Sequence, residues 1–315
     1  MTNLIRAYWC KGGNFGDMLT KHWIEKLTGQ TVQWMHPNKA RLFACGSILR
    51  DAPKGYTGII LGTGFMYEED RRPDLRDADI RSLRGPLTAE RIGIDVPFGD
   101  FGLLFNLFKS ACEKTHDIGS LPHYAVSDRQ DPRHHLISAL AGVDNVARQV
   151  ATCRRLVTSS LHGIILADAL GIESKWVKHK AVLGDGFKFR DYAASLGEDI
   201  IPGKWRLGDQ RRVVEMAKRL REIVVQAIED FTKGGEREDI MRIKCTNPGT
   251  SMLYRPSVED RKVFFSRNGY AVVSDKLGRY LVRTIPSIME VKPEKPNRTT
   301  KRTSKGRSIP LKEGE

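Results

Sequence analysis

Short apolar segments that run into small residues alternate with helix-like segments through about residue 230, and this alternation constrains the fold most strongly. The segments with strand character are residues 4–9, 40–44, 58–61, 80–83, 121–126, 155–158 and 175–178. Two of them lead directly into Gly46 and Gly62. Strands that alternate with helices form parallel sheets, and ligands bind beyond the carboxyl ends of such strands. We therefore expect binding residues at these glycine-containing turns.

Segments with apolar residues on one helical face separate the predicted strands. The predicted helices are residues 17–27, a helix starting at Pro86, and residues 133–140, 143–151, 164–170 and 210–231. Asp17 is expected to cap the first helix, and Gly29 and Gly171 are expected to end helices, because glycine readily adopts the left-handed C-cap conformation. Residues 210–231 carry a continuous apolar stripe, which predicts a long helix packed by one face.

The alternation restarts near Ile118. The sequence therefore predicts an α/β protein with two Rossmann-like halves, residues 1–117 and 118–235, that face a cleft. Residues 241–291 predict a small β-rich accessory module, because Asn268 and Gly269 between two apolar runs favour a hairpin, and a short helix is expected at 275–282. We expect this module to act in oligomerisation or docking.

The formal net charge is +14 at pH 7, and part of it lies in residues 292–315, which predict a disordered basic tail. Residues 292–310 hold seven Lys or Arg residues and one Glu. A net positive charge of this size attracts nucleic acids, anionic membranes and anionic small molecules alike. No aromatic residues interleave with the tail charges, so a base-stacking nucleic-acid surface is not expected there.

The cysteines and glycines exclude several classes of site. The five cysteines lie far apart without a CxxC pair, and no His or acidic residues stand at a ligand spacing, so we expect buried free thiols and no metal site. The turn at residues 11–16 is not GxGxxG and lacks the Lys-Ser/Thr of a P-loop, so no nucleotide cofactor is implied. The chain starts without a secretory signal and has no apolar run of membrane-spanning length, which predicts a cytoplasmic location.

Four short motifs follow or include predicted strands, and their order and spacing carry more information than any one of them. The motifs are Gly13-Asn14-Phe15-Gly16-Asp17, Arg81-Ser82-Leu83-Arg84-Gly85-Pro86-Leu87-Thr88 with Gly99-Asp100, Leu121-Pro122-His123-Tyr124, and Thr158-Ser159-Ser160-Leu161-His162-Gly163. Together they resemble the polysaccharide pyruvyl transferase family over about residues 1–230.

The resemblance implies a GT-B-like fold, phosphoenolpyruvate as donor substrate, a sugar ketal as product and no separate cofactor. It also implies that Arg84 and His162 bind the donor. Many family members carry Arg where this chain has Ser160, so the missing positive charge must come from another residue or the donor phosphate must bind differently. The basic residues nearby in sequence are Arg154, Arg155, Lys188 and Arg190.

The motif residues have chemical and structural interpretations that the sequence leaves open. His162 can act as a general acid at neutral pH, or it can simply hydrogen-bond its turn. Arg84 can bind a carboxylate or phosphate with its planar guanidinium, or it can form a surface ion pair. Asp100 can orient an acceptor hydroxyl as a base, or it can cap the segment that follows.

Ser160 and Gly163 are expected at the donor, because they adjoin a helix start whose N–H groups suit an anion. Asn14, Asp17 and His123 are expected at the acceptor, with capping or turn roles as the alternatives. Metal ligands are not expected among these residues.

Two other functions stay open at this level. One is a nucleotide-sugar glycosyltransferase of GT-B type, and the other is a non-catalytic glycan-binding relative in which Ser160 is the inactivating change. The expected partners are phosphoenolpyruvate and a sugar or glycan acceptor. A lipid-linked acceptor, peripheral membrane contact and a homo-oligomer remain open, and specific nucleic-acid binding is not expected.

Overall fold

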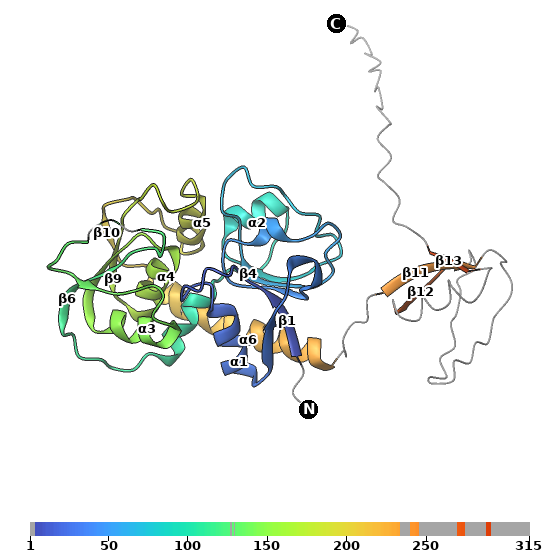
Figure 1. Ribbon diagram of the computed structural model, residues 1–315, viewed down its shortest axis with the longest axis horizontal. Helices are drawn as coiled ribbons and strands as arrows, with labels where there is room; N and C mark the ends of the chain where they lie inside the picture. Colours follow the sequence, from blue (N-terminus) through green and yellow to red (C-terminus); the bar gives the residue numbers. More distant parts are fainter. Residues whose placement is uncertain are drawn as a thin grey trace, which may run out of the picture. The chain divides into compact units, whose positions relative to one another are not determined.

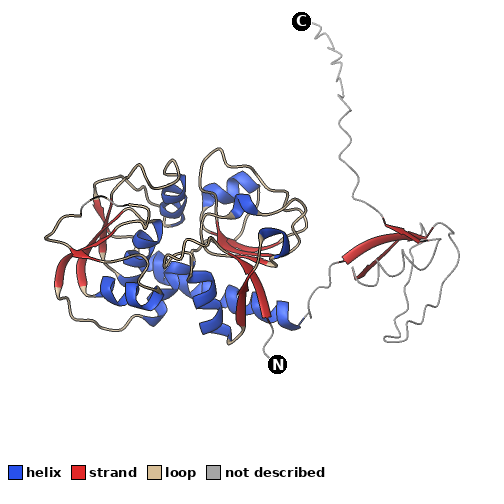
Figure 2. Ribbon diagram, viewed as in Figure 1, coloured by secondary structure: helices blue, strands red, loops and turns tan. Residues whose placement is uncertain are grey.

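The computed structural model divides the chain into two compact units, Met1–Lys233 and Gly234–Glu315. It describes residues 4–126, 128 and 130–233, together with the backbone of three strands at 240–245, 270–274 and 288–290. Figures 1 and 2 show the helices and strands of the described residues. Among these residues, no helix has both the length and the apolar character that a bilayer crossing requires.

A parallel sheet of five strands, in the order β2-β1-β3-β4-β5, forms the centre of the first half. Its strands are β1 (Leu4–Tyr8), β2 (Thr31–Trp34), β3 (Leu42–Phe43), β4 (Ile59–Thr63) and β5 (Asp79–Leu83). The helices of this half are α1 (Leu19–Thr28) and α2 (Pro86–Ile92), with short 3₁₀ turns η1 (Pro37–Lys39) and η2 (Leu49–Asp51). All five residues of β4 are buried, as expected for a central strand covered on both faces.

A second sheet of five strands, in the order β10-β9-β8-β6-β7, forms the centre of the second half. Its strands are β6 (His116–Leu121), β7 (His135–Leu136), β8 (Cys153–Thr158), β9 (Glu173–Trp176) and β10 (Trp205–Arg206). Only β10 pairs antiparallel to its neighbour. The helices are α3 (Val143–Ala151), α4 (Leu161–Leu170) and α5 (Phe187–Ser195). The predicted α/β class with parallel sheets is therefore confirmed.

Two elements join the halves into one core. The 3₁₀ segment η3 (Phe101–Phe108) packs against α1, α4 and α6, and α6 (Gln210–Lys233) packs against α1, α4, β5 and η3 (Figure 1). The buried residues of α6 recur at helical spacing and match the predicted apolar stripe: Val213, Ala217, Leu220, Val224, Ala227 and Ile228. One hydrophobic cluster contains Ile5 of β1 and Leu156 of β8, so the two halves share buried apolar packing.

Two predictions for the second half are wrong. Residues 133–140 form no helix, because Ile137 and Ala139 are buried while Leu136 and Leu140 are exposed, a period of two rather than 3.6. The strand predicted at 121–126 lies earlier in the chain, as β6, and ends at Leu121, directly before Pro122. Proline lacks the N–H that would continue the ladder.

Three strands are described in the second unit: β11 (Ile240–Cys245), β12 (Tyr270–Ser274) and β13 (Ile288–Glu290). They form an antiparallel sheet in the order β12-β11-β13. The predicted turn at Asn268 and Gly269, the helix at 275–282 and the basic tail at 292–315 lie outside the described residues.

Candidate active site

The candidate site is built from segments that follow strands of both sheets. The turn after β1 carries Asn14 and Asp17, Cys45 lies two residues beyond β3, and His123 lies two residues beyond β6. Helix α4, which carries His162, begins directly after the short turn that follows β8. This arrangement agrees with the expectation that ligand-binding residues gather at the carboxyl ends of parallel strands.

His162 is the second residue of α4, so the prediction that this helix begins at residue 164 is wrong. Its Nε2 atom lies 3.3 Å from Sγ of Cys45 and 3.6 Å from Oδ2 of Asp100. The ring meets Phe15 edge-on with centroids 6.3 Å apart. Its side chain is 12% exposed, so the imidazole is held in place by neighbours while part of it remains accessible.

Gly16 explains how the imidazole fits beneath the turn after β1. A Cβ atom added to Gly16 would overlap Nδ1 of His162. The glycine-rich turn of the first half therefore packs directly on the imidazole of the second half, and only a residue without a side chain allows this approach.

Asp100 lies behind the imidazole and is fully buried. It is the N-cap of η3, where Oδ1 accepts the N–H of Gly102 at 2.8 Å and the thiol of Cys45 at 3.5 Å. Burial alone would raise the pKa of Asp100, but the positive charge of His162 and the Gly102 N–H outweigh it and hold this pKa below its usual value. The structure thus shows Asp100 in the capping position and beside His162, without an exposed face toward an acceptor.

Asp17 does not cap α1, contrary to the prediction. The helix begins at Leu19, and its N-cap is Met18, which makes no side-chain capping bond. Asp17 instead forms a reciprocal pair with Asn14: Asn14 Nδ2 donates to Asp17 Oδ2 at 2.5 Å, and the N–H of Asp17 donates to Asn14 Oδ1 at 3.1 Å. Two of the three residues predicted at the acceptor therefore hold each other in one turn.

Burial makes Asp17 a weaker acid than an ordinary aspartate. It raises the pKa of Asp17 from 3.8 to about 6, although the positive charges of His162 and Lys188 and the N–H of Gly12 act in the opposite direction. A carboxyl group with a pKa near neutrality is suited to take a proton from a hydroxyl.

His123 lies in the electrostatic field of both Lys188 and His162. Burial lowers the pKa of His123 to about 4, and the charges of Lys188 and His162 act in the same direction. Burial also lowers the pKa of Lys188 to about 8, together with the charge of Arg84. Lys188 Nζ donates to the carbonyl of Leu183 at 2.8 Å and to Sδ of Met66 at 3.5 Å, which leaves one ammonium proton for a ligand.

Lys188 differs from the other basic residues near the Ser160 position. It is 6% exposed, and its charge acts on Asp17 and His123. The other three have partners elsewhere: Arg154 pairs with Asp117, Arg155 lies over the ring of Trp205, and Arg190 pairs with Glu68.

Ser160 and Gly163 lie at the start of α4, as the motif predicts. Ser160 is the N-cap residue, makes no side-chain capping bond, and donates its N–H to Oγ1 of Thr158 at 3.0 Å. Gly163 packs closely against the same Thr158 side chain. The first N–H groups of a helix have no partner within it, so this end of α4 suits an anion.

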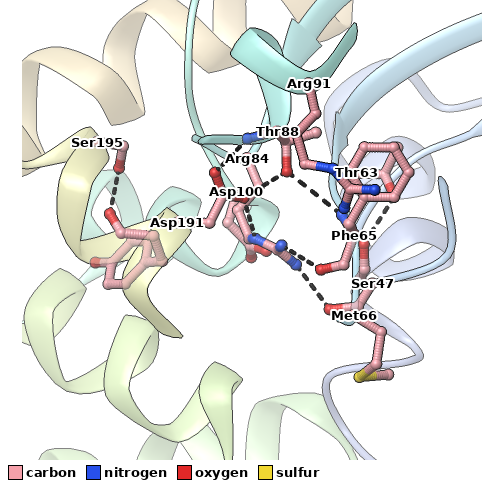
Figure 3. A network of polar contacts seen from close by, with 12 residues as sticks. Ser47, Thr63, Phe65, Met66, Arg84, Thr88, Arg91, Asp100, Asp191 and Ser195 are labelled. Carbon is pink, nitrogen blue, oxygen red and sulfur yellow. Dashed lines mark hydrogen bonds and ion pairs between the residues drawn. The ribbon is translucent and has the colours of Figure 1, made fainter. Parts of the chain in front are cut away.

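Arg84 occupies a different environment from the one predicted (Figure 3). Its side chain is fully buried, and Nε donates to Oδ2 of Asp191 at 2.9 Å. Nη1 donates to Oγ of Ser47 at 2.7 Å, and Nη2 donates to the carbonyl of Phe65 at 2.6 Å. A guanidinium with no exposed surface and three protein acceptors has no face for a donor anion, and it is not a surface ion pair either. The assignment of Arg84 to donor binding is therefore corrected to a structural role.

Asp191 connects the halves through the start of α2. Its Oδ1 accepts the N–H of Thr88 at 2.9 Å, and its Oδ2 accepts the Thr88 hydroxyl at 2.7 Å (Figure 3). The N-cap residue of α2 is Gly85, which has no side chain to cap the helix, and a Cβ there would overlap the carbonyl of Asp191. A carboxylate from α5 thus caps a helix of the other half.

Cys45 is a site residue that the sequence analysis missed. The expectation of buried free thiols holds for Cys45 and Cys153, whereas Cys10 and Cys112 are exposed. Cys45 and His162 are 117 residues apart in the chain, so no spacing pattern could reveal their contact. The only signal was the small-residue turn at Gly46, which marks the end of β3 as a place of close approach.

Comparison with known proteins agrees with the motifs. The polysaccharide pyruvyl transferase family model matches residues 12–179, which is more than half of the 315 residues and includes Asn14, Arg84, Asp100 and His162. This match supports a transferase class for the two α/β halves. The chain belongs to the polysaccharide pyruvyl transferase family.

Two relatives match over a shorter part of the chain. The succinoglycan biosynthesis protein ExoV of Rhizobium meliloti (strain 1021) is 29% identical over 209 residues, which cover 60% of this chain and 64% of ExoV. The uncharacterized protein L143 of Acanthamoeba polyphaga mimivirus is 28% identical over 215 residues, which cover 60% of this chain and 73% of L143.

Proposed function

We propose that this protein transfers pyruvate from phosphoenolpyruvate to a sugar of a glycan precursor and forms a cyclic ketal. Family membership supports a transferase, and one relative is named for the biosynthesis of a polysaccharide. The observation that carries the proposal is the partly accessible imidazole of His162 at the start of α4, with Asp100 behind it.

The reaction needs a proton donor, cationic or N–H groups for the donor's anions, and a base for the acceptor. Protonation of C3 of phosphoenolpyruvate makes C2 electrophilic, and a sugar hydroxyl attacks C2 as it loses its proton. The C2–O bond to phosphate then breaks, and a second hydroxyl attacks C2 and loses its proton to close the ketal. Inorganic phosphate leaves with the bonding electrons and one of the released protons.

His162 is proposed as the general acid that protonates C3. An imidazole exchanges protons readily near neutral pH, and general acid catalysis contributes about 10²- to 10⁴-fold to such steps. Asp100 acts as a positioning residue, because its buried carboxylate lies 3.6 Å from Nε2 and can orient the ring.

The donor anion is proposed to bind between the start of α4 and Lys188. The hydroxyl of Ser160, which makes no capping bond, and the backbone N–H of Gly163 lie at this helix end, and the buried ammonium of Lys188 acts on His123 as His162 does. Lys188 therefore takes the place of the arginine that the family resemblance expects at position 160, and Arg84 holds the surrounding structure.

The acceptor is proposed to lie against Asn14, Asp17 and His123. Burial raises the pKa of Asp17 to about 6, so its carboxylate can take the proton of an attacking hydroxyl. Burial lowers the pKa of His123 to about 4, so its imidazole is neutral at physiological pH and can hydrogen-bond a sugar hydroxyl.

The remaining features of the proposal concern the setting of the enzyme. We propose a GT-B-like arrangement of the two halves, at residues 1–117 and 118–235, with no cofactor besides the donor substrate. The location is proposed to be cytoplasmic, where phosphoenolpyruvate is made. The acceptor is proposed to be a glycan or its lipid-linked precursor, and residues 241–291 are proposed to serve docking or self-association.

Mass spectrometry of the reaction in ²H₂O tests the proposal. The full chain is incubated with phosphoenolpyruvate and a panel of oligosaccharides, and we expect a product heavier by one pyruvyl ketal, with one phosphate released per ketal. The ketal methyl group should carry one deuterium, because C3 takes its third hydrogen from an exchangeable acid. Tight binding of nucleotide sugars together with no binding of phosphoenolpyruvate would instead support a glycosyltransferase and contradict the proposal.

A further inference from the structure

Three side chains of different chemistry, including the imidazole of His162, lie close together. Cys45 follows β3, Asp100 begins η3, and His162 lies in the first turn of α4. One ligand atom from each of them lies within 4.8 Å of the other two. Within the part of the chain that the structure describes, this is the one group of three or more such side chains at metal-ligand range.

The separations agree with the edges of a metal tetrahedron. Zinc binds sulfur at about 2.3 Å and nitrogen or oxygen at about 2.0–2.2 Å, so neighbouring ligand atoms in a tetrahedral site are about 3.3–3.6 Å apart. Cys45 Sγ lies 3.3 Å from His162 Nε2, and His162 Nε2 lies 3.6 Å from Asp100 Oδ2. Two of the three ligand pairs are therefore already at the spacing of a tetrahedral site, and the third pair lies within 4.8 Å.

The electrostatic state of the site favours a cation. Asp100 is fully buried, and its Oδ2 atom has no hydrogen-bond partner among the described residues. A buried carboxylate oxygen without a donor is costly, and a metal ion would satisfy it. The positive charges that act on Asp100 are those of Arg84 and, when its ring is protonated, His162.

The set of ligands selects the kind of metal. A thiolate, an imidazole and a carboxylate together suit Zn²⁺, whereas Mg²⁺ and Ca²⁺ prefer oxygen ligands alone. Burial raises the pKa of the Cys45 thiol, so it is protonated in the metal-free protein and donates to Asp100 Oδ1 at 3.5 Å. Metal binding replaces the S–H bond with an S–Zn bond and releases that proton to solvent.

We propose that Cys45, Asp100 and His162 form a zinc site with a fourth position for water. The metal takes the lone pair of His162 Nε2, so metal binding and protonation of this nitrogen exclude each other. Zinc therefore inhibits the transferase, a consequence that rests on the proposed function, whereas zinc binding itself does not.

Direct metal binding by the metal-free full chain tests the site. Zn²⁺ affinity is measured by competition with a chromophoric chelator, and Co²⁺ is used as a spectroscopic probe of the same site. The exposed Cys10 and Cys112 are replaced by Ser in every variant, so that surface thiols do not contribute. We expect one equivalent of metal and a sulfur-to-cobalt charge-transfer band.

Matched variants locate the ligands. Cys45→Ser keeps the size and polarity of the side chain but removes the thiolate, so we expect Zn²⁺ affinity to fall at least about 100-fold and the charge-transfer band to disappear. Cys153→Ser is the control, because Cys153 is the other buried thiol among the described residues and donates to the carbonyl of Gln149 in the second half. This variant should bind metal as the parent does. Asp100→Asn should also weaken binding. Thermal unfolding confirms that each variant is folded.

The possible results test the zinc site and the proposed transferase function separately. The zinc site is overturned if the parent with Co²⁺ gives no charge-transfer band, and this measurement does not depend on the Cys45→Ser variant. It is also overturned if Cys45→Ser binds Zn²⁺ as tightly as the parent. Metal-free protein that binds Zn²⁺ as described but forms no pyruvylated product would sustain the zinc site and contradict the proposed function. If Zn²⁺ inhibits the parent, a chelator reverses the inhibition, and Cys45→Ser is not inhibited, both the zinc site and the proposed function are supported.

Discussion

Arg84 and Asp191, 107 residues apart in the chain, form an ion pair at 2.9 Å in which neither side chain has exposed surface. One residue follows β5 of the first half and the other lies in α5 of the second. The pair therefore fixes the two halves beside the site, and Thr88, Ser47 and the carbonyl of Phe65 provide further hydrogen bonds to it. This role differs from the donor contact that the motif suggested.

Replacement of Arg84 tests that structural role. Arg84→Met leaves the carboxylate of Asp191 buried without its charge partner, so we expect the free energy of unfolding to fall by about 3–5 kcal/mol. Arg81→Met is the control, because Arg81 is 33% exposed in its ion pairs and should cost less than about 1 kcal/mol. Chemical denaturation measures both. An Arg84→Met protein of parental stability that no longer binds phosphoenolpyruvate would restore the donor-binding assignment.

Lys188 is expected to supply the charge that Ser160 cannot. Lys188→Met should raise the Kd for phosphoenolpyruvate about 10- to 100-fold, since hydrogen bonds to charged groups contribute about 1.5–3 kcal/mol. Arg190→Met, two residues away and in an exposed pair with Glu68, should change the Kd less than about 3-fold. Isothermal titration calorimetry gives both values. Equal affinity in the parent and Lys188→Met would contradict this assignment.

Asp17 gives the stability of the protein a defined pH dependence. Burial raises its pKa from 3.8 to about 6, so the folded protein binds this proton more tightly than the unfolded chain does. Ionisation of Asp17 therefore lowers the free energy of unfolding progressively as pH rises from about 4 to about 6, and this loss of stability persists at higher pH. Asp17→Asn removes the loss, so its unfolding midpoint at pH 7.5 should exceed that of the parent while transfer activity falls.

Thermal unfolding across the pH range checks this result. Asp117→Asn, at a side chain that is 87% exposed, is the control and should follow the parental profile. A parental profile for Asp17→Asn as well would show that Asp17 titrates normally in the folded protein.

The contact between Gly16 and His162 predicts a loss of activity without unfolding. Gly16→Ala places a methyl group where Nδ1 of the imidazole lies, so the ring must leave its present position beside Cys45 and Asp100. We expect the transfer rate to fall at least about 100-fold, because small displacements of catalytic groups cost this much. Gly13→Ala is the control: its φ of +69° makes the change mildly strained, but no atom lies within 4 Å of the added carbon. Equal rates in both variants would show that the imidazole does not need this packing.

Periodicity and glycine placement predicted most of the framework. The long helix α6 and helix α3 follow their apolar stripes, because local spacing determines which face can be buried. Strand β3 ends shortly before Gly46, and β4 ends one residue after Gly62. Helix α5 was missed because it buries Lys188 and Asp191, two charged residues whose burial depends on partners from the other half.

The chemistry of the site was predicted only in part. The motifs placed His162, Asp100, Asn14 and Asp17 in one region, but they could not distinguish a side chain that faces a ligand from one that supports it. The sequence predicted that Asp17 caps a helix, because its carboxylate precedes an apolar stripe. In the structure Asp17 pairs with Asn14 instead. The contact between Cys45 and His162 depends on tertiary packing across 117 residues, which no local pattern encodes.

The role of His162 as the acid that protonates C3 is tested most directly by the rate of ketal formation in His162→Gln. Glutamine keeps a polar side chain of similar length but cannot exchange a proton near neutral pH. Mass spectrometry of a pyruvylated glycan should show formation at least about 100-fold slower than in the parent, with an unchanged unfolding midpoint. Ketal formation by His162→Gln at the parental rate would contradict the central claim.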